Sequence, residues 1–422
     1  MLIQLSKAEL ILKVKSVGVY MLIPIVNLAV SIFTTPLFAK YLTAAEFGYF
    51  GYYTSIANFL GIIFGLSLNT YYMSMYYRVE EVERKQMLIS LTIFSLLLNC
   101  MLFPILYFGI YLYSKLSHST IPFSPFALII YGASAIAVYK NFVQIDYKLS
   151  NKPIKYTVFF LSYRVLTTLV SLYFLVYLNS GLIGRLIGAM VVESLFFLIT
   201  LKHIFSAGQI KIDWKQIRRA FKFIGPLIPG SLLFLPLGSY DNIVLERLHD
   251  PVNMGLYNIG KSISYYLYLS LFSCYQVFEP EIYKNAVERN IPELKKIFII
   301  LTAIIFCGVL AFWFLSPVLI NYLTAGKYNE AVEYANIWAI TNGLVIYFSI
   351  FDAIILALQK SKKSLVIHLV SAVLCLTLYS AFGYFFKQRG IAIGAALTYF
   401  ILVIMQAFFM IRIFRSTPFS SS

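Results

Sequence analysis

Five ionisable side chains lie inside long apolar runs of this chain and are its strongest candidates for chemistry. Two are bases and three are acids: Arg164, Lys261, Glu193, Asp241 and Asp352. At a rise of about 1.5 Å per helical residue, Arg164 and Glu193 lie roughly 13 Å from the ends of their runs. A charge at that depth in a bilayer costs roughly 2.5–3.5 kcal/mol on insertion scales, so each needs a partner or a polar cavity.

The two bases could bind an anionic group while it crosses the membrane. Guanidinium and ammonium donors offset the desolvation of a phosphate or diphosphate in a low-dielectric core. Arg164 and Lys261 fall in opposite halves of the sequence, as a central site requires. The alternative for Arg164 is a structural ion pair with Glu193 on the neighbouring run.

The three acids are candidates for coupling transport to a proton or another cation. Asp241, Asp352 and Glu193 could do this because carboxylates in such cavities can exchange a proton or hold a cation. The alternative for each is an ion pair with a basic neighbour, and for Glu193 we favour that alternative.

Membrane-spanning helices must position these side chains. Of 422 residues, 60% are hydrophobic and 12% are charged, against roughly 45–50% and 25% in soluble domains, which excludes a soluble enzyme. The runs are too uniformly apolar for barrel strands, which alternate over about 10 residues. We predict an all-α polytopic protein with twelve spans, at residues 17–37, 49–72, 87–113, 124–143, 155–178, 181–201, 222–246, 255–278, 297–320, 332–358, 364–386 and 390–413.

The basic excess indicates membrane orientation. The chain has 34 Lys and Arg against 18 Asp and Glu, a formal charge of +16, but the bases cluster between spans, so no nucleic-acid partner is expected. Most lie on the side of the N-terminus, which predicts that both termini are cytoplasmic. The minority on the outer side are Lys40, Lys115, Arg185, Arg247, Lys327, Lys387 and Arg389.

The spans divide into two six-helix halves, residues 1–203 and 223–422, joined by a cytoplasmic amphipathic linker at 204–222. Residues 41–60 align with 248–267 at an offset that pairs Gly48 with Gly255 and Ser55 with Ser262. Because each half has an even number of spans, the repeat is parallel, with an axis along the membrane normal and a site expected between the halves.

No metal or cofactor site is predicted. The four cysteines lie singly in apolar runs without CxxC or Cys/His spacing, at Cys100, Cys274, Cys307 and Cys375. We interpret them as buried apolar residues. The N-terminal segment lacks the pattern of a cleaved signal peptide.

Three segments carry a resemblance to a known family. They are KYLTAAEFGYF after the first span, PLIPGSLLFLPLGSYDNIVLERLHDPVNMGLYNIGKSIS around the seventh, and AGKYNEAVEYA at 325–335. They resemble polysaccharide flippases of the multidrug/oligosaccharidyl-lipid/polysaccharide superfamily. The matching motif residues are Pro226, Pro229, Asp241, Gly255 and Tyr257; Asn242 stands where many relatives carry a base.

The resemblance implies a MATE-like fold and a transporter without enzymatic activity in the bacterial inner membrane. The implied activity is flipping of an undecaprenyl-pyrophosphate-linked oligosaccharide repeat unit to the periplasmic leaflet by alternating access. The implied pathway is O-antigen, lipopolysaccharide or other surface polysaccharide synthesis. A proton or sodium ion as coupling ion, and polymerase and chain-length proteins of the pathway as partners, are further expectations.

Two other classes fit less well. A multidrug exporter of the same superfamily would favour acidic, aromatic cavities for cations, whereas this chain has two bases inside its spans. A polysaccharide polymerase or glycosyltransferase would need a sizeable outer loop, and the outer loops are short. The sequence contains no DxD motif and no Ser/His/Asp set.

Overall fold

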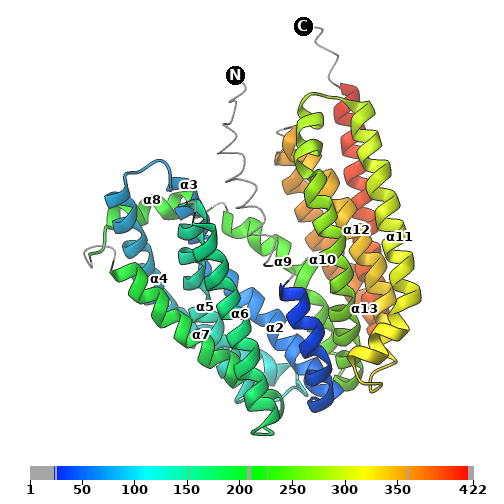
Figure 1. Cartoon of the computed structure of the whole chain (residues 1–422), viewed down its shortest axis with the longest axis horizontal. Coiled ribbons are helices and arrows are strands. Elements are labelled where there is room, and N and C mark those ends of the chain that lie inside the picture. The colour runs from blue at the N-terminus through cyan, green and yellow to red at the C-terminus, as the bar shows by residue number, and fades with distance from the viewer. Residues whose placement is uncertain are drawn as a thin grey trace. The chain divides into compact units, whose positions relative to one another are not determined.

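The computed structural model describes residues 23, 26–150, 152–206, 211–225, 227–358 and 361–416, and its regular elements within these ranges are helices. Residues 26–41 form the first helix (Figure 1). The helices that follow are α2 (Ala44–Gly65), α3 (Leu68–Met75), α4 (Glu81–Leu116), α5 (Phe126–Leu149), α6 (Pro153–Val176), α7 (Gly181–Phe205), α8 (Trp214–Ile224), α9 (Leu227–Glu246), α10 (Pro251–Val287), α11 (Ile291–Leu323), α12 (Ala331–Ala357) and α13 (Ser361–Ser416).

The helices confirm the predicted fold class. Within the described ranges, seven are long and apolar enough to cross a membrane, or up to eight if α2 and α3, bent by 49°, form one span. The bend falls at Leu66 and Ser67, both with left-handed φ. Lys387, with φ 52° and ψ −139°, breaks α13 into two arms. Helix 26–41, the α2–α3 pair, α4–α7, α9–α12 and these arms overlap the twelve predicted spans.

Some predictions fall on residues outside the described ranges. These residues are Pro226, the start of the first predicted span, the N-terminal segment considered for a signal peptide, and both ends of the chain. Part of the predicted linker, residues 207–210, lies there too. These predictions remain predictions.

The chain forms two compact units. The N-terminal unit contains residues 1–42 and 56–229, and the C-terminal unit contains residues 43–55 and 230–422. The first turns of α2 therefore belong with the second half of the sequence, and α8 belongs with the first. Each unit has a core of its own, with Phe64, Tyr131 and Tyr139 buried in the first and Tyr257 and Tyr379 in the second.

The prediction that all four cysteines are buried is wrong for two of them. Cys375 is buried and Cys274 is partly buried, but Cys100 on α4 and Cys307 on α11 are exposed. Both exposed residues lie midway along apolar helices, where a soft, weakly polar thiol is compatible with lipid contact. Hydropathy alone does not distinguish the lipid-facing side of such a helix from its packed side.

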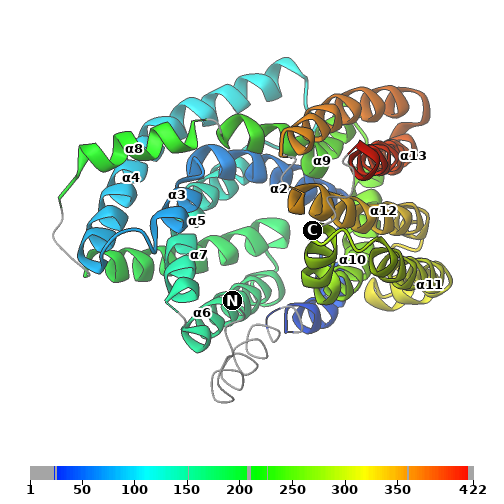
Figure 2. The same ribbon diagram turned by 90° about the horizontal axis from the view of Figure 1, so that it is seen from above.

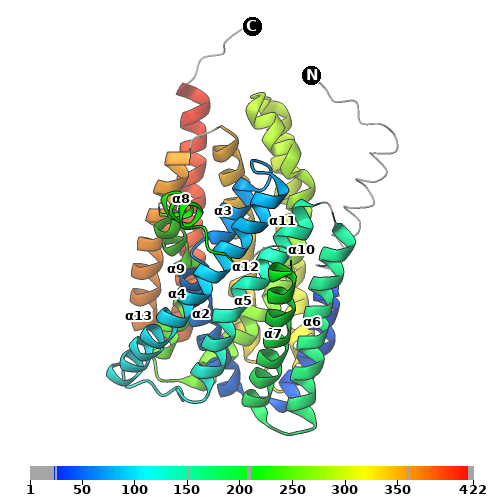
Figure 3. The same cartoon turned by 90° about the vertical axis from the view of Figure 1, so that its left-hand side faces the viewer.

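Helix α8 of the N-terminal unit is the amphipathic segment that the sequence predicts. Asp213 caps it by accepting hydrogen bonds from the backbone N–H groups of Lys215 and Gln216. Ile217 is buried, whereas Trp214 is 63% exposed. The helix lies against α3 and α4, at the end of the unit where α3 lies (Figure 3).

In the C-terminal unit, α12 packs against α10, α11 and α13, and α10 also packs against α11 (Figure 2). Residues 43–55 approach α10 so closely that two positions require glycine. A Cβ on Gly255 would overlap the carbonyl oxygen of Ala44, and one on Gly48 would lie 2.6 Å from that of Pro251. The sequence repeat pairs Gly48 with Gly255 and Ala44 with Pro251, so these contacts are reciprocal, as a two-fold relation requires.

Candidate functional site

Asp241 and Lys261 form an ion pair inside the C-terminal unit. The Lys261 ammonium lies 2.5 Å from Asp241 Oδ2, and the Tyr257 hydroxyl donates to the same oxygen at 2.8 Å. The ammonium also lies 4.5 Å from the centre of the Trp338 ring. Asp241 is 1% exposed, whereas the Lys261 side chain is 25% exposed. The ion pair therefore joins a fully buried carboxylate, Asp241, to a partly exposed ammonium, Lys261.

The positions of these residues follow from the helices that carry them. Tyr257 and Lys261 are four residues apart on α10, so they share one face and both reach Asp241 on α9. Trp338 approaches from α12 and packs edge to face on Tyr257, with ring centroids 6.0 Å apart. The Gly255 and Tyr257 motif therefore makes two contacts. Gly255 allows the backbone at Ala44 to approach closely, and the Tyr257 hydroxyl donates a hydrogen bond that holds Asp241 in place.

Asp241 is only half satisfied by these donors. Its Oδ1 is buried and has no hydrogen-bond partner among the described residues. The adjacent Asn242 is engaged elsewhere, because it donates to Ser55 at 2.9 Å and accepts from Asn258 at 2.8 Å. Asn242 therefore joins α9 to α2 and α10.

Glu193 lies in a closed cluster of the N-terminal unit. Its two oxygens lie 2.8 and 2.6 Å from the Lys140 ammonium, and the Tyr163 hydroxyl donates to it at 2.5 Å. Lys140 also lies 3.9 Å from the centre of the Tyr163 ring. The side chains of Lys140 and Glu193 are 15% and 6% exposed. The charge of Glu193 is therefore neutralised within its own unit.

Arg164 has no such counterion in the described part of the chain. It lies halfway along α6, and its Nη2 donates to Ser31 Oγ at 3.3 Å. Its Nε is buried without a hydrogen-bond partner, and no carboxylate lies within 4 Å among the residues that the structure describes. The alternative that Arg164 pairs with Glu193 is wrong, because Lys140 occupies that carboxylate.

A second guanidinium in the same unit adds to this positive charge. Arg185, which the sequence count placed in an outer loop, lies in the first turns of α7, and its guanidinium carbon lies 4.1 Å from the centre of the Phe38 ring. It is near enough to Arg164 for the two like charges to interact.

Asp352 lies in the C-terminal unit, on α12, near Tyr275 and Tyr283 of α10. The Tyr275 hydroxyl donates to Glu279 at 3.2 Å. Two carboxylates and two phenols therefore gather on these helices, separate from the Asp241 and Lys261 pair.

Sequence reasoning missed Lys140, which the count of bases assigned to a cytoplasmic loop. Helix α5 continues to Leu149, nine residues further on, so Lys140 lies about 13 Å inside the end of the helix. The available signal was its position, since Lys140 falls within the predicted span 124–143. Tyr163 and Trp338 were missed because one tyrosine among 33, or an indole without a neighbouring charge in sequence, carries no signal.

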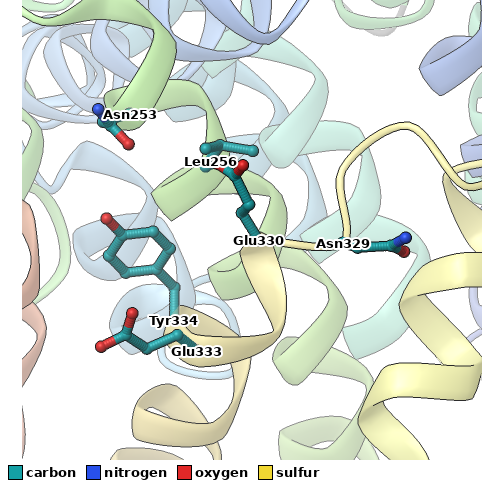
Figure 4. A pocket seen from close by; sticks show the side chains of 6 residues that line it. All are labelled: Asn253, Leu256, Asn329, Glu330, Glu333 and Tyr334. Atoms are coloured by element: carbon teal, nitrogen blue, oxygen red, sulfur yellow. The ribbon is translucent and has the colours of Figure 1, made fainter.

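The C-terminal unit also has a polar pocket of about 430 Å³ near the start of α12. Figure 4 shows its lining, with Asn253 and Leu256 on α10 and Glu330, Glu333 and Tyr334 at the start of α12. Glu333 is engaged by the Arg389 guanidinium at 2.7 Å. The pocket contains none of the five predicted site residues. Within the described ranges no group of three or more His, Cys, Asp or Glu could hold a metal ion.

Solved structures define the class of this fold. An inward-facing multidrug resistance MATE family transporter of the MOP superfamily matches with a TM-score of 0.75 at 13% identity, over 96% of this chain and 99% of that chain. The lipid II flippase MurJ, in an inward closed conformation, matches with a TM-score of 0.68 at 17% identity, over 94% and 89%. A MOP superfamily transporter from Pyrococcus furiosus matches with a TM-score of 0.59 at 13% identity, over 94% of each chain. The fold is that of MOP superfamily membrane transporters.

The family follows from the sequence itself. The model of the polysaccharide biosynthesis protein family matches residues 13–286, well over half of the chain, and the chain belongs to that family. A comparison of this chain with curated protein sequences found no match. The resemblance inferred from the Pro229, Asp241, Gly255 and Tyr257 motifs is thereby confirmed, and the chain is a multi-pass membrane protein of this family with the MOP superfamily fold.

Proposed function

We propose that this protein flips an undecaprenyl-diphosphate-linked oligosaccharide repeat unit from the cytoplasmic to the periplasmic leaflet of a bacterial inner membrane. The product would feed O-antigen or another surface polysaccharide. Membership of the polysaccharide biosynthesis family supports this proposal, as does a fold shared with a lipid II flippase. The proposed role is transport by alternating access, with no chemical step on the substrate.

The observation that carries the proposal is the charge of Arg164. A guanidinium halfway along a membrane-spanning helix needs an anion, and the described part of the chain places only the Ser31 hydroxyl in hydrogen-bond contact with its terminal nitrogens. A diphosphate offers acceptor oxygens that fit a guanidinium in bidentate geometry. An exporter of organic cations would gain nothing from an uncompensated base at this depth.

Lys261 has a different part in the proposal, because Asp241 already holds it. Protonation of Asp241, or binding of a cation at its unpartnered Oδ1, would weaken the 2.5 Å ion pair and free the partly exposed ammonium for the substrate. Asp241 is therefore the proposed coupling residue, and Lys261 the proposed second substrate contact.

The other two acids differ in what they can contribute. Glu193 is fully engaged by Lys140 and Tyr163, so we assign it a structural role in the N-terminal unit. Asp352, near Tyr275 and Glu279, is kept as a second candidate for ion coupling. The proposed protein partners are the polymerase and chain-length proteins of the pathway.

The test is surface polysaccharide in a strain that lacks the native gene and carries Arg164→Gln, Arg164→Lys or the control Lys155→Gln. Lys155 is an exposed base in the first turn of the same helix. We expect loss of polysaccharide with Arg164→Gln, partial retention with Arg164→Lys, and a normal level with Lys155→Gln, all at equal membrane abundance. Normal polysaccharide with Arg164→Gln would overturn the role of this base.

A further inference from the structure

A cavity of about 440 Å³ lies in the N-terminal unit, and its lining contains none of the candidate site residues described above. Its volume falls in the range of roughly 300–1,000 Å³ that is usual for small-molecule sites. Five helices of the unit end or begin around it, at Met75 of α3, Glu81 of α4, Leu149 of α5, Pro153 of α6 and Phe205 of α7. The distribution of bases predicts that this end is cytoplasmic.

Three bases and two acids line this cavity, together with one histidine. The bases are Arg84, Lys85 and Lys152, and the acids are Glu81 and Asp146. Glu81 is paired with Lys85, one helical turn away, at 2.6 Å. Arg84 and Lys152 have no carboxylate within 4 Å among the described residues, so their charges are available to a ligand.

The Asp146 carboxylate interacts with two other side chains that line the cavity. The Tyr72 hydroxyl donates to its Oδ1 at 3.0 Å, and His203 Nε2 lies 3.9 Å from its Oδ2. Tyr72 is 1% exposed, which fixes the carboxylate against the floor. Asp146 therefore does not cancel the charge of Arg84 or Lys152 by direct contact.

Arg84 is held in a fixed orientation by Tyr76. Its guanidinium carbon lies 4.1 Å from the centre of the Tyr76 ring, and its Nη1 donates to the Tyr76 carbonyl oxygen at 3.2 Å. Tyr76 is 3% exposed, so this platform is rigid. A guanidinium carries five N–H donors, and the bond to Tyr76 leaves others for a planar, bidentate contact with phosphate oxygens.

Apolar side chains flank these lining residues. Tyr77, Val82 and Ile154 are 73%, 79% and 64% exposed, and they directly follow Tyr76, adjoin Glu81 or lie within two residues of Lys152. Exposed apolar groups beside a basic cavity, at the end of a membrane-spanning bundle, suit a ligand that carries both a phosphate and acyl chains.

We propose that this cavity binds the phosphate headgroup of an anionic phospholipid, with Arg84 and Lys152 as its charge contacts. Basic pockets between spanning helices on the cytoplasmic side bind anionic headgroups by the same chemistry. The lipid would join the ends of α4 and α6 in the N-terminal unit. This site is separate from the proposed transport of a lipid-linked oligosaccharide and does not depend on it.

The experiment measures retention of phosphatidylglycerol by the purified full-length protein in detergent, using native mass spectrometry over a lipid titration. The pocket variant is Arg84→Gln with Lys152→Gln. The matched control is Lys148→Gln with Lys155→Gln, which removes two exposed bases from the same end of the unit without touching the cavity. Phosphatidylcholine, glycerol 3-phosphate and inorganic pyrophosphate serve as competitors.

We expect one retained phosphatidylglycerol in the wild type and the control, and affinity lower by about 30-fold in the pocket variant. That factor equals about 2 kcal/mol at 1.4 kcal/mol per tenfold. Lys152→Glu, a change at an exposed position, gives the same readout if the double variant fails to fold. Equal losses in pocket and control variants would overturn the proposal. Competition by glycerol 3-phosphate or pyrophosphate at equal concentration would assign the site to a free anion and overturn the lipid.

Discussion

Removing the Lys261 ammonium should destabilise the protein more than removing the charge of its partner. Lys261→Met leaves Asp241, which is 1% exposed, with Tyr257 as its remaining described donor and with Oδ1 still unpartnered. Breaking a buried ion pair from one side costs about 3–5 kcal/mol. Because the Lys261 side chain is 25% exposed, water offsets part of the loss, and we expect the low end of that range, about 3 kcal/mol.

Asp241→Asn should cost less, about 1–2 kcal/mol, because Lys261 can turn its ammonium to solvent and keeps the Trp338 ring beneath it. The double variant Asp241→Asn with Lys261→Met contains no unpaired charge. It should therefore lose no more than about 1 kcal/mol, so the coupling energy between the two sites, which is the sum of the two single losses less the loss of the double variant, is about 3–4 kcal/mol.

The assay is the apparent unfolding midpoint of the purified protein in one detergent at fixed ionic strength. By size scaling, each kcal/mol shifts the midpoint of a chain of this length by roughly 1–2 °C. We expect the midpoint of Lys261→Met to be the lowest, that of Asp241→Asn to be intermediate, and that of the double variant to be near wild type. A Lys261→Met protein as stable as wild type, or a double variant less stable than both single variants, would contradict a stabilising ion pair between Asp241 and Lys261.

Two further predictions concern packing and the second ion pair. Gly255→Ala should lower the unfolding midpoint by the equivalent of about 1–3 kcal/mol because the added Cβ meets the Ala44 carbonyl. The control Gly109→Ala should raise the midpoint slightly, because that helical site has no described neighbour within 4 Å of the added Cβ. Equal midpoints of the two variants would contradict the close approach at Gly255. Lys140→Met should lower the free energy of unfolding by about 3–5 kcal/mol because it leaves Glu193 buried and unpaired. In the same assay, adding Glu193→Gln to this variant should restore the midpoint. A further fall of the midpoint would contradict the pairing of Lys140 with Glu193.

The spans could be predicted from sequence because hydropathy and charge position act locally along the chain. The repeat between residues 41–60 and 248–267 was also informative, since Gly48 and Gly255 make reciprocal close contacts. The membership of residues 43–55 in the C-terminal unit could not be predicted. It depends on the close crossing of α2 and α10 at Gly48 and Gly255, and hydrophobic periodicity along one helix does not identify the helix that it will contact.

The ion pairs inside the membrane were harder to predict from the sequence than the spans. Asp241 and Lys261 are 20 residues apart on different helices, and Lys140 and Glu193 are 53 apart. Pairing at such separations depends on helix rotation and on which side chains face each other. The sequence identified buried charges at Arg164 and Glu193, but the only partner it offered, as the alternative to a binding role for Arg164, was a pair between these two, because Lys140 had been counted as a loop residue.

The most direct test of the proposed function is the leaflet distribution of lipid-linked oligosaccharide in cells that lack this protein. Spheroplasts of the deletion strain would be treated with a membrane-impermeant reagent that modifies only outward-facing sugars. We expect the repeat units to accumulate on the cytoplasmic leaflet, protected from the reagent, and we expect the wild-type gene, but not Arg164→Gln, to restore their exposure. Unpolymerised repeat units on the outer leaflet of the deletion strain would contradict the proposed function.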